Sequence, residues 1–381
     1  MNSNYKIGIL GGGQLGKMLT LAAQNWDVET HILDVSKDFP AGNSCTHFIE
    51  GDFKNYKDVL KFGKDKDVIT VEIESVNTEA LMELQLQGKI IHPRPEALNL
   101  IKDKGLQKNF YQINNLPTSS FVFYENEKDI AAAIKKGDLK YPFVQKARTG
   151  GYDGRGVAVI KSEKDISKIL PVASVVEPLV DIQKELSVVV ARNESGEVKT
   201  FPVVEMEFNP SLNLVEYLIC PAAVSEEVAK KSEEIAIATI EAFDICGLLA
   251  VELFLTKDNE ILINEVAPRP HNSGHHSIDA CVTSQYQQHL RAIMNLPLGD
   301  TSIQMPSVMV NLLGADGYTG DAVYENFDKC MAVAGAKFHL YGKKITKPFR
   351  KMGHATVVDS DIVKAKEKAK YIMDTLKIKT Q

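Results

Sequence analysis

Two glutamates on neighbouring predicted strands could hold a metal ion. Glu252 and Glu265 each lie within an apolar run, on either side of a turn centred on Asp258 and Asn259. A hairpin with this turn places the two glutamates directly opposite each other, with Cβ atoms about 5 Å apart. Carboxylates at that distance repel each other, and apolar neighbours make an unpaired charge costly. A divalent cation resolves the conflict, and Mg²⁺ fits because it typically binds one or two carboxylates, water and phosphate oxygens.

Two alternatives to a metal site are that one glutamate faces solvent, or that the register is shifted by one residue. Asn264 precedes Glu265 and would complete the metal shell or bind a phosphate. In the loop that follows, Arg269 can bind a carboxylate or phosphate through two hydrogen bonds. The same loop has three histidines, which fit either a zinc site or a solvated loop: His271, His275 and His276.

A glycine-rich loop at residues 145–157 separates two short apolar runs and predicts a strand, a loop and a second strand. It has four glycines in seven positions, 150–156. Successive N–H groups in such a loop can form an anion-binding concavity. Basic side chains add positive charge: Lys146, Arg148 and Arg155. We predict a polyphosphate ligand; the alternative is a long hairpin turn, and the spacing is not that of a Walker A motif.

The N-terminal segment predicts a doubly wound parallel sheet, with strands at 6–10, 30–34 and 68–72. Gly11, Gly13 and Gly16 fit the G-x-G-x-x-G pattern, and Asp34 ends the next strand. Alone, this pattern suggests a dinucleotide enzyme, but the same turn suits any phosphate or small anion. Glu74, at the end of another strand, is a candidate substrate contact or a solvated acid.

We expect three domains: a Rossmann-like domain at residues 1–98, a small β-α-β-β-α-β lid domain at 117–180 and a larger mixed domain at 181–381. Expected helices are 96–113, 128–136, 164–170 and 225–243, the last capped by Ser225. A hairpin is expected from 185–191 and 198–206. Near the C-terminus, four basic residues flank Pro348 and either bind an anion or form a solvated turn: Lys343, Lys344, Arg350 and Lys351.

Composition limits the functional classes. The 381 residues carry a net charge of −6, which argues against nucleic acid as a partner. No apolar run is long enough for a membrane span, and the polar N-terminus is no secretion signal, so we expect a cytoplasmic protein. The five cysteines are far apart, without a Cys-x-x-Cys pair, and are expected to be reduced.

The chain resembles the 5-(carboxyamino)imidazole ribonucleotide synthetases, ATP-grasp enzymes of bacterial purine biosynthesis. Four motifs, spread over essentially the whole chain, carry the resemblance: Gly11 to Gly16 with Gln14 and Leu15, Lys146 to Gly156 (KARTGGYDGRG), Asn264 to His275 (NEVAPRPHNSGH) and Arg350 to His354 (RKMGH). It implies an α/β (α+β) ATP-grasp fold with a Rossmann-like pre-ATP-grasp domain.

The resemblance also implies roles for individual residues. ATP would be bound by its phosphates at Lys104 and Lys146, beneath a cover formed by Gly151, Tyr152, Asp153, Gly154, Arg155, Gly156 and Val157. Adenine would meet Glu177, Pro178, Leu179 and Val180; Glu185 would hold the ribose; and Glu252 and Glu265 would bind Mg²⁺. The contacts to 5-aminoimidazole ribonucleotide would come from Gln14, Leu15, Glu74, Tyr152, Asn272, Ser273, Lys343, Arg350 and Lys351, with the basic residues at its 5′-phosphate.

The implied reaction is carboxylation of the amine of 5-aminoimidazole ribonucleotide by bicarbonate, with ATP cleaved to ADP and phosphate through carboxyphosphate. Arg269 and Arg155 are candidates for stabilising bicarbonate and carboxyphosphate. Either Asp153 or His271 would remove the amine proton. The family implies a homodimer, and the sequence leaves open a direct transfer of product to the mutase that follows.

Two positions depart from the family pattern. Phe208 stands where relatives often have histidine, so no nucleotide contact is expected there, and Lys104 is often arginine. A nearer rival is the formate-using glycinamide ribonucleotide transformylase, which the glycine loop and the C-terminal basic turn disfavour. A dinucleotide oxidoreductase would leave the Glu252 and Glu265 pair unexplained, and a nucleotide-binding regulator would not need the Arg269 loop.

Overall fold

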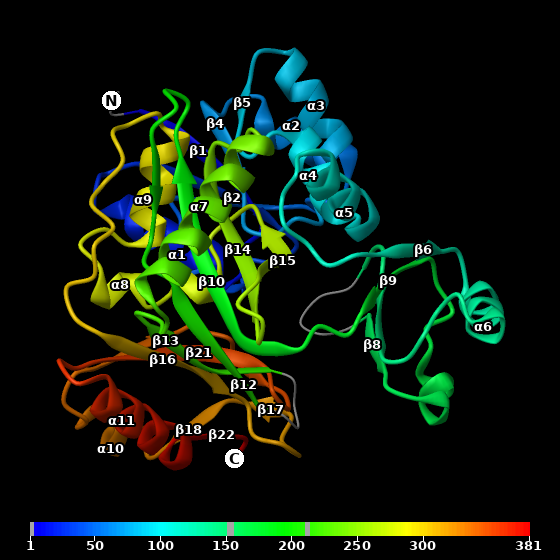
Figure 1. The fold of residues 1–381 in the computed structure, drawn as a ribbon. Helices are drawn as coiled ribbons and strands as arrows, with labels where there is room; N and C mark the ends of the chain where they lie inside the picture. The colour runs from blue at the N-terminus through cyan, green and yellow to red at the C-terminus, as the bar shows by residue number, and fades with distance from the viewer. Residues whose placement is uncertain (1–3, 151–155, 210–213) are drawn as a thin grey trace.

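The computed structural model describes residues 4–150, 156–209 and 214–381. Three main sheets organise this part of the chain, and Figure 1 shows the smallest of them projecting to the right, away from the other two. No described helix is both long and apolar enough to cross a membrane. All five cysteines are free, as expected.

The N-terminal sheet has five parallel strands in the order β3-β2-β1-β4-β5, which confirms the predicted doubly wound arrangement. Its strands are β1 (Lys6–Leu10), β2 (Glu29–Asp34), β3 (His47–Glu50), β4 (Val68–Val71) and β5 (Ile90–Ile91). Its helices are α1 (Gln14–Gln24), the 3₁₀ turn η1 (Pro40–Asn43), α2 (Tyr56–Gly63) and α3 (Thr78–Leu86). All strands point the same way, so their carboxyl ends form one edge.

The helix expected at 96–113 is two helices, α4 (Pro95–Lys102) and α5 (Lys104–Ile113). Asp103 ends the first and caps the second, because its side chain accepts hydrogen bonds from the N–H groups of Gly105 and Leu106 at 2.7 and 3.1 Å. An acid that bonds the following turn in this way starts a new helix at its own position.

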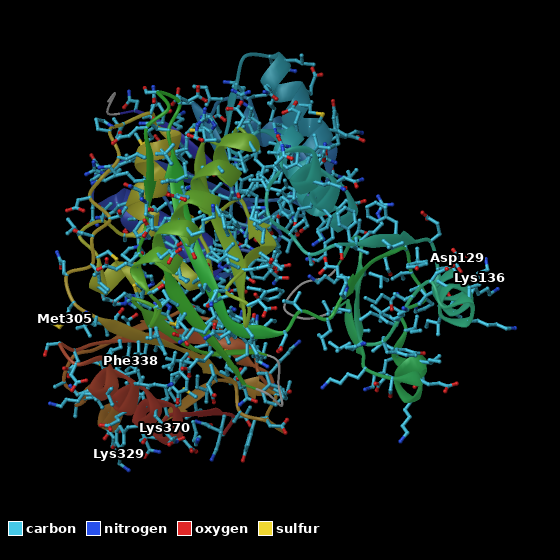
Figure 2. All side chains as sticks on the ribbon, viewed as in Figure 1. Asp129, Lys136, Met305, Lys329, Phe338 and Lys370 are labelled. Atoms are coloured by element: carbon cyan, nitrogen blue, oxygen red, sulfur yellow. The ribbon has the colours of Figure 1, made fainter. Side chains whose placement is uncertain are left out.

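The small sheet has four antiparallel strands in the order β6-β9-β7-β8. They are β6 (Val122–Tyr124), β7 (Phe143–Ala147), β8 (Val157–Ile160) and β9 (Ser174–Pro178). Helix α6 (Glu127–Lys136) covers it, and Asp129 and Lys136 lie on its exposed side (Figure 2). The α-helix predicted at 164–170 is wrong: this segment is the 3₁₀ turn η2 (Glu163–Lys168), which has no buried residue to hold a longer helix.

The large sheet is antiparallel, in the order β15-β14-β10-β12-β13-β16-β21-β19, with β11 beside β10. The expected hairpin pairs β10 with two strands, because the second arm is divided at buried Phe201. Its strands are β10 (Ile182–Arg192), β11 (Val198–Thr200), β12 (Val204–Asn209), β13 (Leu214–Cys220), β14 (Gly247–Thr256), β15 (Ile261–Ala267), β16 (Ser307–Leu313), β19 (Ala336–Leu340) and β21 (Lys351–Val358). Short pairs join β17 (Gly320–Asp321) to β20 (Ile345–Thr346) and β18 (Val323–Glu325) to β22 (Lys377–Lys379).

Helices on the large sheet form its cores. The expected long helix is α7 (Glu226–Ala242), capped by Ser225, and it packs on β10 and β14. Helix α9 (Gln285–Ile293) contacts both β14 and α1, so one core of Leu15, Leu19, Tyr286 and Leu290 joins the N-terminal sheet to the large sheet. The remaining helical elements are η3 (Asn272–Gly274), α8 (Ser277–Ala280), α10 (Phe327–Met331) and α11 (Ile362–Thr375), which packs on β16 and β21.

Candidate functional site

The two glutamates pair across adjacent strands. Glu252 of β14 lies opposite Glu265 of β15, which confirms the predicted pair, although the register shifts by one residue between Glu252 and Leu253, nearer the turn. Burial and the neighbouring charge of Glu265 raise the pKa of Glu252 to about 8. Burial also acts to raise the pKa of Glu265, but the ammonium of Lys104 at 2.5 Å outweighs it and leaves the pKa below its ordinary value. One carboxylate therefore has a cation and the other faces a like charge, which favours a further cation between them.

Three lysines gather beside this pair. Lys146 Nζ donates to Asn264 Oδ1 at 2.9 Å and lies 3.1 Å from Glu177 Oε2. Lys108 Nζ lies 2.8 Å from Glu177 Oε1. Although burial acts to raise it, the pKa of Glu177 is lowered by these two ammonium groups. Sequence reasoning missed Lys108, which its spacing of one helical turn from Lys104 could have indicated.

Arg148 serves a different purpose from the one expected. Its guanidinium binds Asp103 at 2.7 and 3.1 Å, so its charge ties the small sheet to the start of α5. The backbone supports the same junction, since Lys104 N–H donates to Arg148 O at 2.8 Å. Of the predicted cover, Gly156 has a positive φ of 78° and Val157 begins β8; Gly151, Tyr152, Asp153, Gly154 and Arg155 lie outside the described residues.

The predicted adenine and ribose contacts lie along the segment that leads from the small sheet into the large sheet. Glu177 and Pro178 end β9, Leu179 and Val180 connect the sheets, and Glu185 lies in β10. Burial raises the pKa of Glu185 to about 7, and its charge adds to the rise in the pKa of Glu252. This connection therefore carries acidic groups to the same place as the glutamate pair.

The loop after β15 joins the site to the N-terminal sheet. Arg269 Nε lies 2.8 Å from Glu74 Oε1, so two residues singled out separately meet across the two sheets. Asn272 and Ser273 begin η3 further along the same loop. The loop that follows Glu265 thus contacts the carboxyl edge of the N-terminal sheet.

His271 has a defined hydrogen-bond arrangement. Its Nδ1 accepts from the backbone N–H of Ser273 and lies 2.9 Å from the Ser273 hydroxyl, which itself accepts from Ser187 at 2.8 Å. The Nε2 of His271 lies 3.6 Å from Glu252 Oε1. His271 therefore lies between Ser273 and the glutamate pair.

The other two loop histidines are neither solvated nor grouped as zinc ligands among the described residues. His275 is buried and its Nδ1 lies 3.0 Å from Gln285 Nε2, and His276 Nδ1 bonds Ser273 O at 3.0 Å. Burial lowers the pKa of His276 to about 4. They shape the loop that carries His271.

The glycine turn before α1 is filled by the protein itself. Glu72, directly after β4, accepts from Gly13 and Gly16 N–H at 2.8 and 2.9 Å. Its carboxylate takes the helix-terminal place where a dinucleotide would put its phosphates, which disfavours the oxidoreductase interpretation. Sequence reasoning missed this residue, although an acid at a strand end opposite a glycine turn was the available signal. Asp34 accepts from Gly12 N–H at 2.7 Å.

Two predicted substrate contacts stand at this turn. Gln14 is the first residue of α1 and is partly exposed. The side chain of Leu15 is packed in the core with Tyr286, so any contact with a nucleotide would come from its backbone. The Phe208 side chain is likewise apolar packing, against the cluster that contains Met206 and Leu218.

The basic segment near residue 348 lies against the N-terminal sheet and the large sheet. Lys344 pairs with Asp38 at 2.6 Å, and Lys17 of α1 donates to Leu340 O at 2.8 Å. Lys343 Nζ donates to Lys351 O at 2.7 Å, and an Arg350 nitrogen donates to Ile345 O. Lys351 is near enough to Glu252 for its charge to act on that pKa. The segment thus completes one side of the site.

Comparison with known protein families divides the chain into three parts. Residues 4–102 match a ribonucleotide synthetase preATP-grasp domain, residues 109–286 match an ATP-grasp domain, and residues 307–368 match a phosphoribosylaminoimidazole carboxylase C-terminal domain.

Whole-chain comparisons point the same way. The crystal structure of N5-carboxyaminoimidazole ribonucleotide synthetase from Thermotoga maritima is 43% identical, covers 99% of this chain and 100% of that one, and has a TM-score of 0.91. The synthase from Aspergillus clavatus, solved in complex with ADP and 5-aminoimidazole ribonucleotide, is 31% identical, with 98% and 99% covered and a TM-score of 0.89.

A longer relative is phosphoribosylaminoimidazole carboxylase of Candida glabrata, 41% identical over 382 residues. The match includes 96% of this chain but only 66% of that protein. The chain therefore spans slightly less than two thirds of the length of this relative.

Proposed function

The chain belongs to the N5-carboxyaminoimidazole ribonucleotide synthetase family of ATP-grasp enzymes, and from this premise we propose that it carboxylates 5-aminoimidazole ribonucleotide with bicarbonate. ATP would be cleaved to ADP and phosphate, with carboxyphosphate as the intermediate, in purine biosynthesis. The observation that carries the proposal is the facing pair Glu252 and Glu265, with Lys104 and Lys146 beside it.

These residues fit Mg²⁺. The raised pKa of Glu252 reflects a carboxylate in conflict with its neighbour, and a cation held by Glu252 and Glu265 removes that conflict. Mg²⁺ would neutralise charge on the phosphoryl oxygens during transfer. Lys104 and Lys146 would then meet the phosphates, and Asn264 orients Lys146 through its 2.9 Å bond.

The substrate pocket would lie between the N-terminal sheet, residues 1–98, and the large unit, residues 181–381. Gln14 and Glu74 would contact the nucleotide from one side, and Asn272 and Ser273 from the other. Lys343, Arg350 and Lys351 would bind its 5′-phosphate. The small unit, residues 117–180, would close over ATP through its glycine loop and exclude water from carboxyphosphate.

We assign proton removal from the amine to Asp153 rather than His271. His271 Nδ1 is engaged with Ser273, and its Nε2 lies 3.6 Å from Glu252 Oε1, so the ring is already placed against the glutamate pair. We expect Asp153→Asn to lower turnover by roughly 10²- to 10⁴-fold. His271→Gln should lower turnover less and should keep the acidic limb of the pH–rate profile; loss of that limb in His271→Gln would reverse the assignment.

Arg269 would stabilise bicarbonate and carboxyphosphate together with Arg155. Arg269 already pairs with Glu74, so the incoming anion would share its guanidinium with this acid or replace it. This placement puts the anion between the N-terminal edge and the glutamate pair.

The decisive experiment measures phosphate release from MgATP and bicarbonate, with and without 5-aminoimidazole ribonucleotide. We expect release to require the nucleotide and to fall at least about 100-fold in Glu265→Gln. Glu260→Gln, an exposed residue on the same hairpin, is the matched control and should behave as wild type. Stimulation by formate or another amine instead would refute the substrate assignment and leave the ATP-grasp site intact.

We also expect a cytoplasmic homodimer, as the family resemblance implies. Light scattering during size-exclusion chromatography would give the mass of the assembly. Coupling to the mutase that follows would appear as product transfer without release, measured by trapping free product in a coupled assay.

A further inference from the structure

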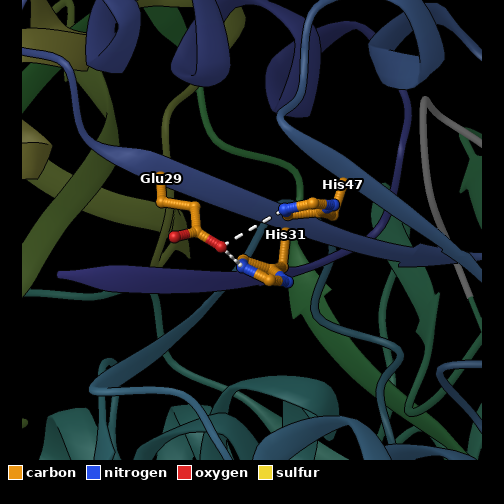
Figure 3. A group of neighbouring side chains, drawn as sticks. All are labelled: Glu29, His31 and His47. Carbon is orange, nitrogen blue, oxygen red and sulfur yellow. Dashed lines mark hydrogen bonds and ion pairs between the residues drawn. The ribbon is translucent and has the colours of Figure 1, made fainter. Parts of the chain in front are cut away.

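Away from the ATP site, two clusters in the described part of the chain bring three side chains of metal-ligand type together. The first is Glu29, His31 and His47, on β2 and β3 (Figure 3). There, one carboxylate oxygen lies 2.7 Å from His31 Nε2 and 3.3 Å from His47 Nε2, so it serves both rings. In this cluster each Nε2 already faces the carboxylate, so it gives no indication of a missing ligand.

The second cluster consists of His92, Glu194 and Cys246, and it does not satisfy itself. His92 is only 2% exposed, and within the described residues neither of its ring nitrogens has a hydrogen-bond partner. Its Nε2 lies 3.3 Å from Glu194 Oε1, and the ligand atoms of all three residues lie within 4.8 Å of one another. His92 thus has one buried ring nitrogen, Nδ1, with no polar partner among the described residues, and this costs free energy.

The three residues come from separate parts of the fold. His92 follows β5 of the N-terminal sheet, Glu194 lies in the turn between β10 and β11, and Cys246 directly precedes β14. The cluster therefore bridges the N-terminal sheet and the large sheet, and it shares no residue with the ATP-site motifs, although Cys246 directly precedes the strand that carries Glu252. A bond shared by all three would fasten the two sheets to each other.

The donor set is suited to zinc. Thiolate, imidazole and carboxylate are its usual protein ligands, and bonds of about 2.0–2.3 Å in a tetrahedron separate ligand atoms by roughly 3.3–3.7 Å. The His92 to Glu194 distance of 3.3 Å already meets this spacing. The Cys246 thiol now donates to Ala292 O at 3.3 Å and would have to turn toward the other two.

Access and charge are also compatible with an ion. The Glu194 side chain is 45% exposed, which opens the cluster to solvent and leaves room for water as a fourth ligand. Two arginines are near Cys246, but both pair with Asp244: Arg94 at 2.7 Å and Arg192 at 3.0 Å. Their charge is thus partly compensated.

We propose that His92, Glu194 and Cys246 form a Zn²⁺ site that fastens the N-terminal sheet to the large sheet. When the ion binds, the thiol S–H bond breaks, a Zn–S bond forms and the proton leaves to solvent. This site is independent of the proposed carboxylation and does not use the ATP-site carboxylates.

The test uses Co²⁺ as the probe, with the full chain in excess Mg²⁺ so that the Glu252 and Glu265 pair is saturated. We expect one equivalent of Co²⁺ to produce a sulfur-to-cobalt charge-transfer band, which Zn²⁺ abolishes by displacement. Cys246→Ser should remove the band. Glu194→Gln should weaken binding by at least about tenfold, since losing even an outer partner of a metal ligand costs that much.

Two control variants separate this site from others. Cys45→Ser removes a partly exposed thiol, and His47→Ala alters the first cluster; both should keep the band. Zn²⁺ should raise the melting temperature of the wild type but not that of Glu194→Gln, and turnover of Glu194→Gln should be unchanged. If Cys246→Ser does not fold, the exposed Glu194→Gln variant still decides. No band in the wild type, wild-type affinity in Glu194→Gln, or a band lost with Cys45 would overturn the site.

Discussion

Glu72 directly follows a strand of the N-terminal sheet and Glu252 lies within a strand of the large sheet, and the two glutamates differ in what surrounds the carboxylate. Glu72 accepts two backbone N–H groups from the glycine turn at 2.8 and 2.9 Å. Glu252 faces Glu265 across a strand pair, while the adjacent Lys104 is bound to Glu265. Burial raises the pKa of both acids, but two backbone N–H groups oppose the rise at Glu72, whereas two neighbouring acids add to it at Glu252. Glu252 is therefore the acid that favours a bound cation.

The contrast also shows that a glycine-rich turn does not always hold a ligand. The turn at residues 11–16 resembles a phosphate-binding turn, but a carboxylate of the protein occupies it. The position is further closed to side chains, since a Cβ on Gly13 would lie 2.5 Å from Glu72 Oε1. A motif for anion binding therefore identifies the kind of group that is bound and leaves open whether it is a ligand or a neighbouring residue.

The largest expected effect comes from removing one of the two facing carboxylates of the large sheet. Glu252→Gln should lower kcat/KM by roughly 100- to 1,000-fold, because a metal-holding carboxylate is lost. Without Mg²⁺ its melting temperature should equal or exceed that of the wild type, because the repulsion between the two acids is relieved. Steady-state phosphate release and calorimetry measure the two quantities. A destabilised but active variant would show that Glu252 is structural.

The corresponding substitution at the N-terminal sheet should reduce stability. Glu72→Gln should lower the free energy of unfolding by about 1–3 kcal/mol, because an amide group then faces a backbone N–H donor. Urea unfolding measures this, with exposed Glu79→Gln as the control. Gly13→Ala should destabilise through the same carboxylate, so the two changes should be non-additive in a double-mutant cycle. Additive effects would show that Glu72 and Gly13 do not interact.

The buried histidine His276 should make the stability of the protein depend on pH. Burial lowers the pKa of His276 to about 4, below the value of about 6.5 in the unfolded chain. The unfolded state therefore takes up a proton first, and stability is retained above pH 6.5 and lost as the pH falls from about 6.5 to 4, by ~1.4 kcal/mol per pH unit. His276→Gln should show a shallower loss of unfolding free energy across this range. If the unfolding free energy of the wild type and of His276→Gln changed equally with pH, the attribution of this loss to His276 would be wrong.

The last prediction is that nicotinamide dinucleotides do not bind. Because Glu72 occupies the glycine turn, titration with NADH or NADPH should leave nicotinamide fluorescence unchanged. The same titration with a fluorescent ATP analogue and Mg²⁺ should give saturable binding at the other sheet. Saturable nicotinamide binding would restore the dinucleotide interpretation.

Local patterns in the sequence are sufficient to predict much of the fold. The parallel N-terminal strands and the long helix capped by Ser225 follow from short-range periodicity and capping. The pairing of Glu252 with Glu265 was predicted correctly, but it also depends on a register shift between Glu252 and Leu253 that the turn position does not give. The two wrong helix predictions also have local causes. Asp103 divides one predicted helix by capping its second half, and residues 163–168 form a 3₁₀ turn with no buried face.

Residue types and their spacing are enough to single out the facing carboxylates, and the four motifs carry the resemblance to the family, but Glu72 and Lys108 were missed. Which of these charges meet is a property of the folded chain. Glu72 reaches Gly13, Arg269 reaches Glu74, Arg148 reaches Asp103, and His92 lies beside Cys246. These partners are far apart in the chain, and no periodicity of the sequence encodes their distance. Whether an acid is satisfied or available to a ligand depends on packing between sheets, because that packing sets both the dielectric surroundings and the nearest opposite charge.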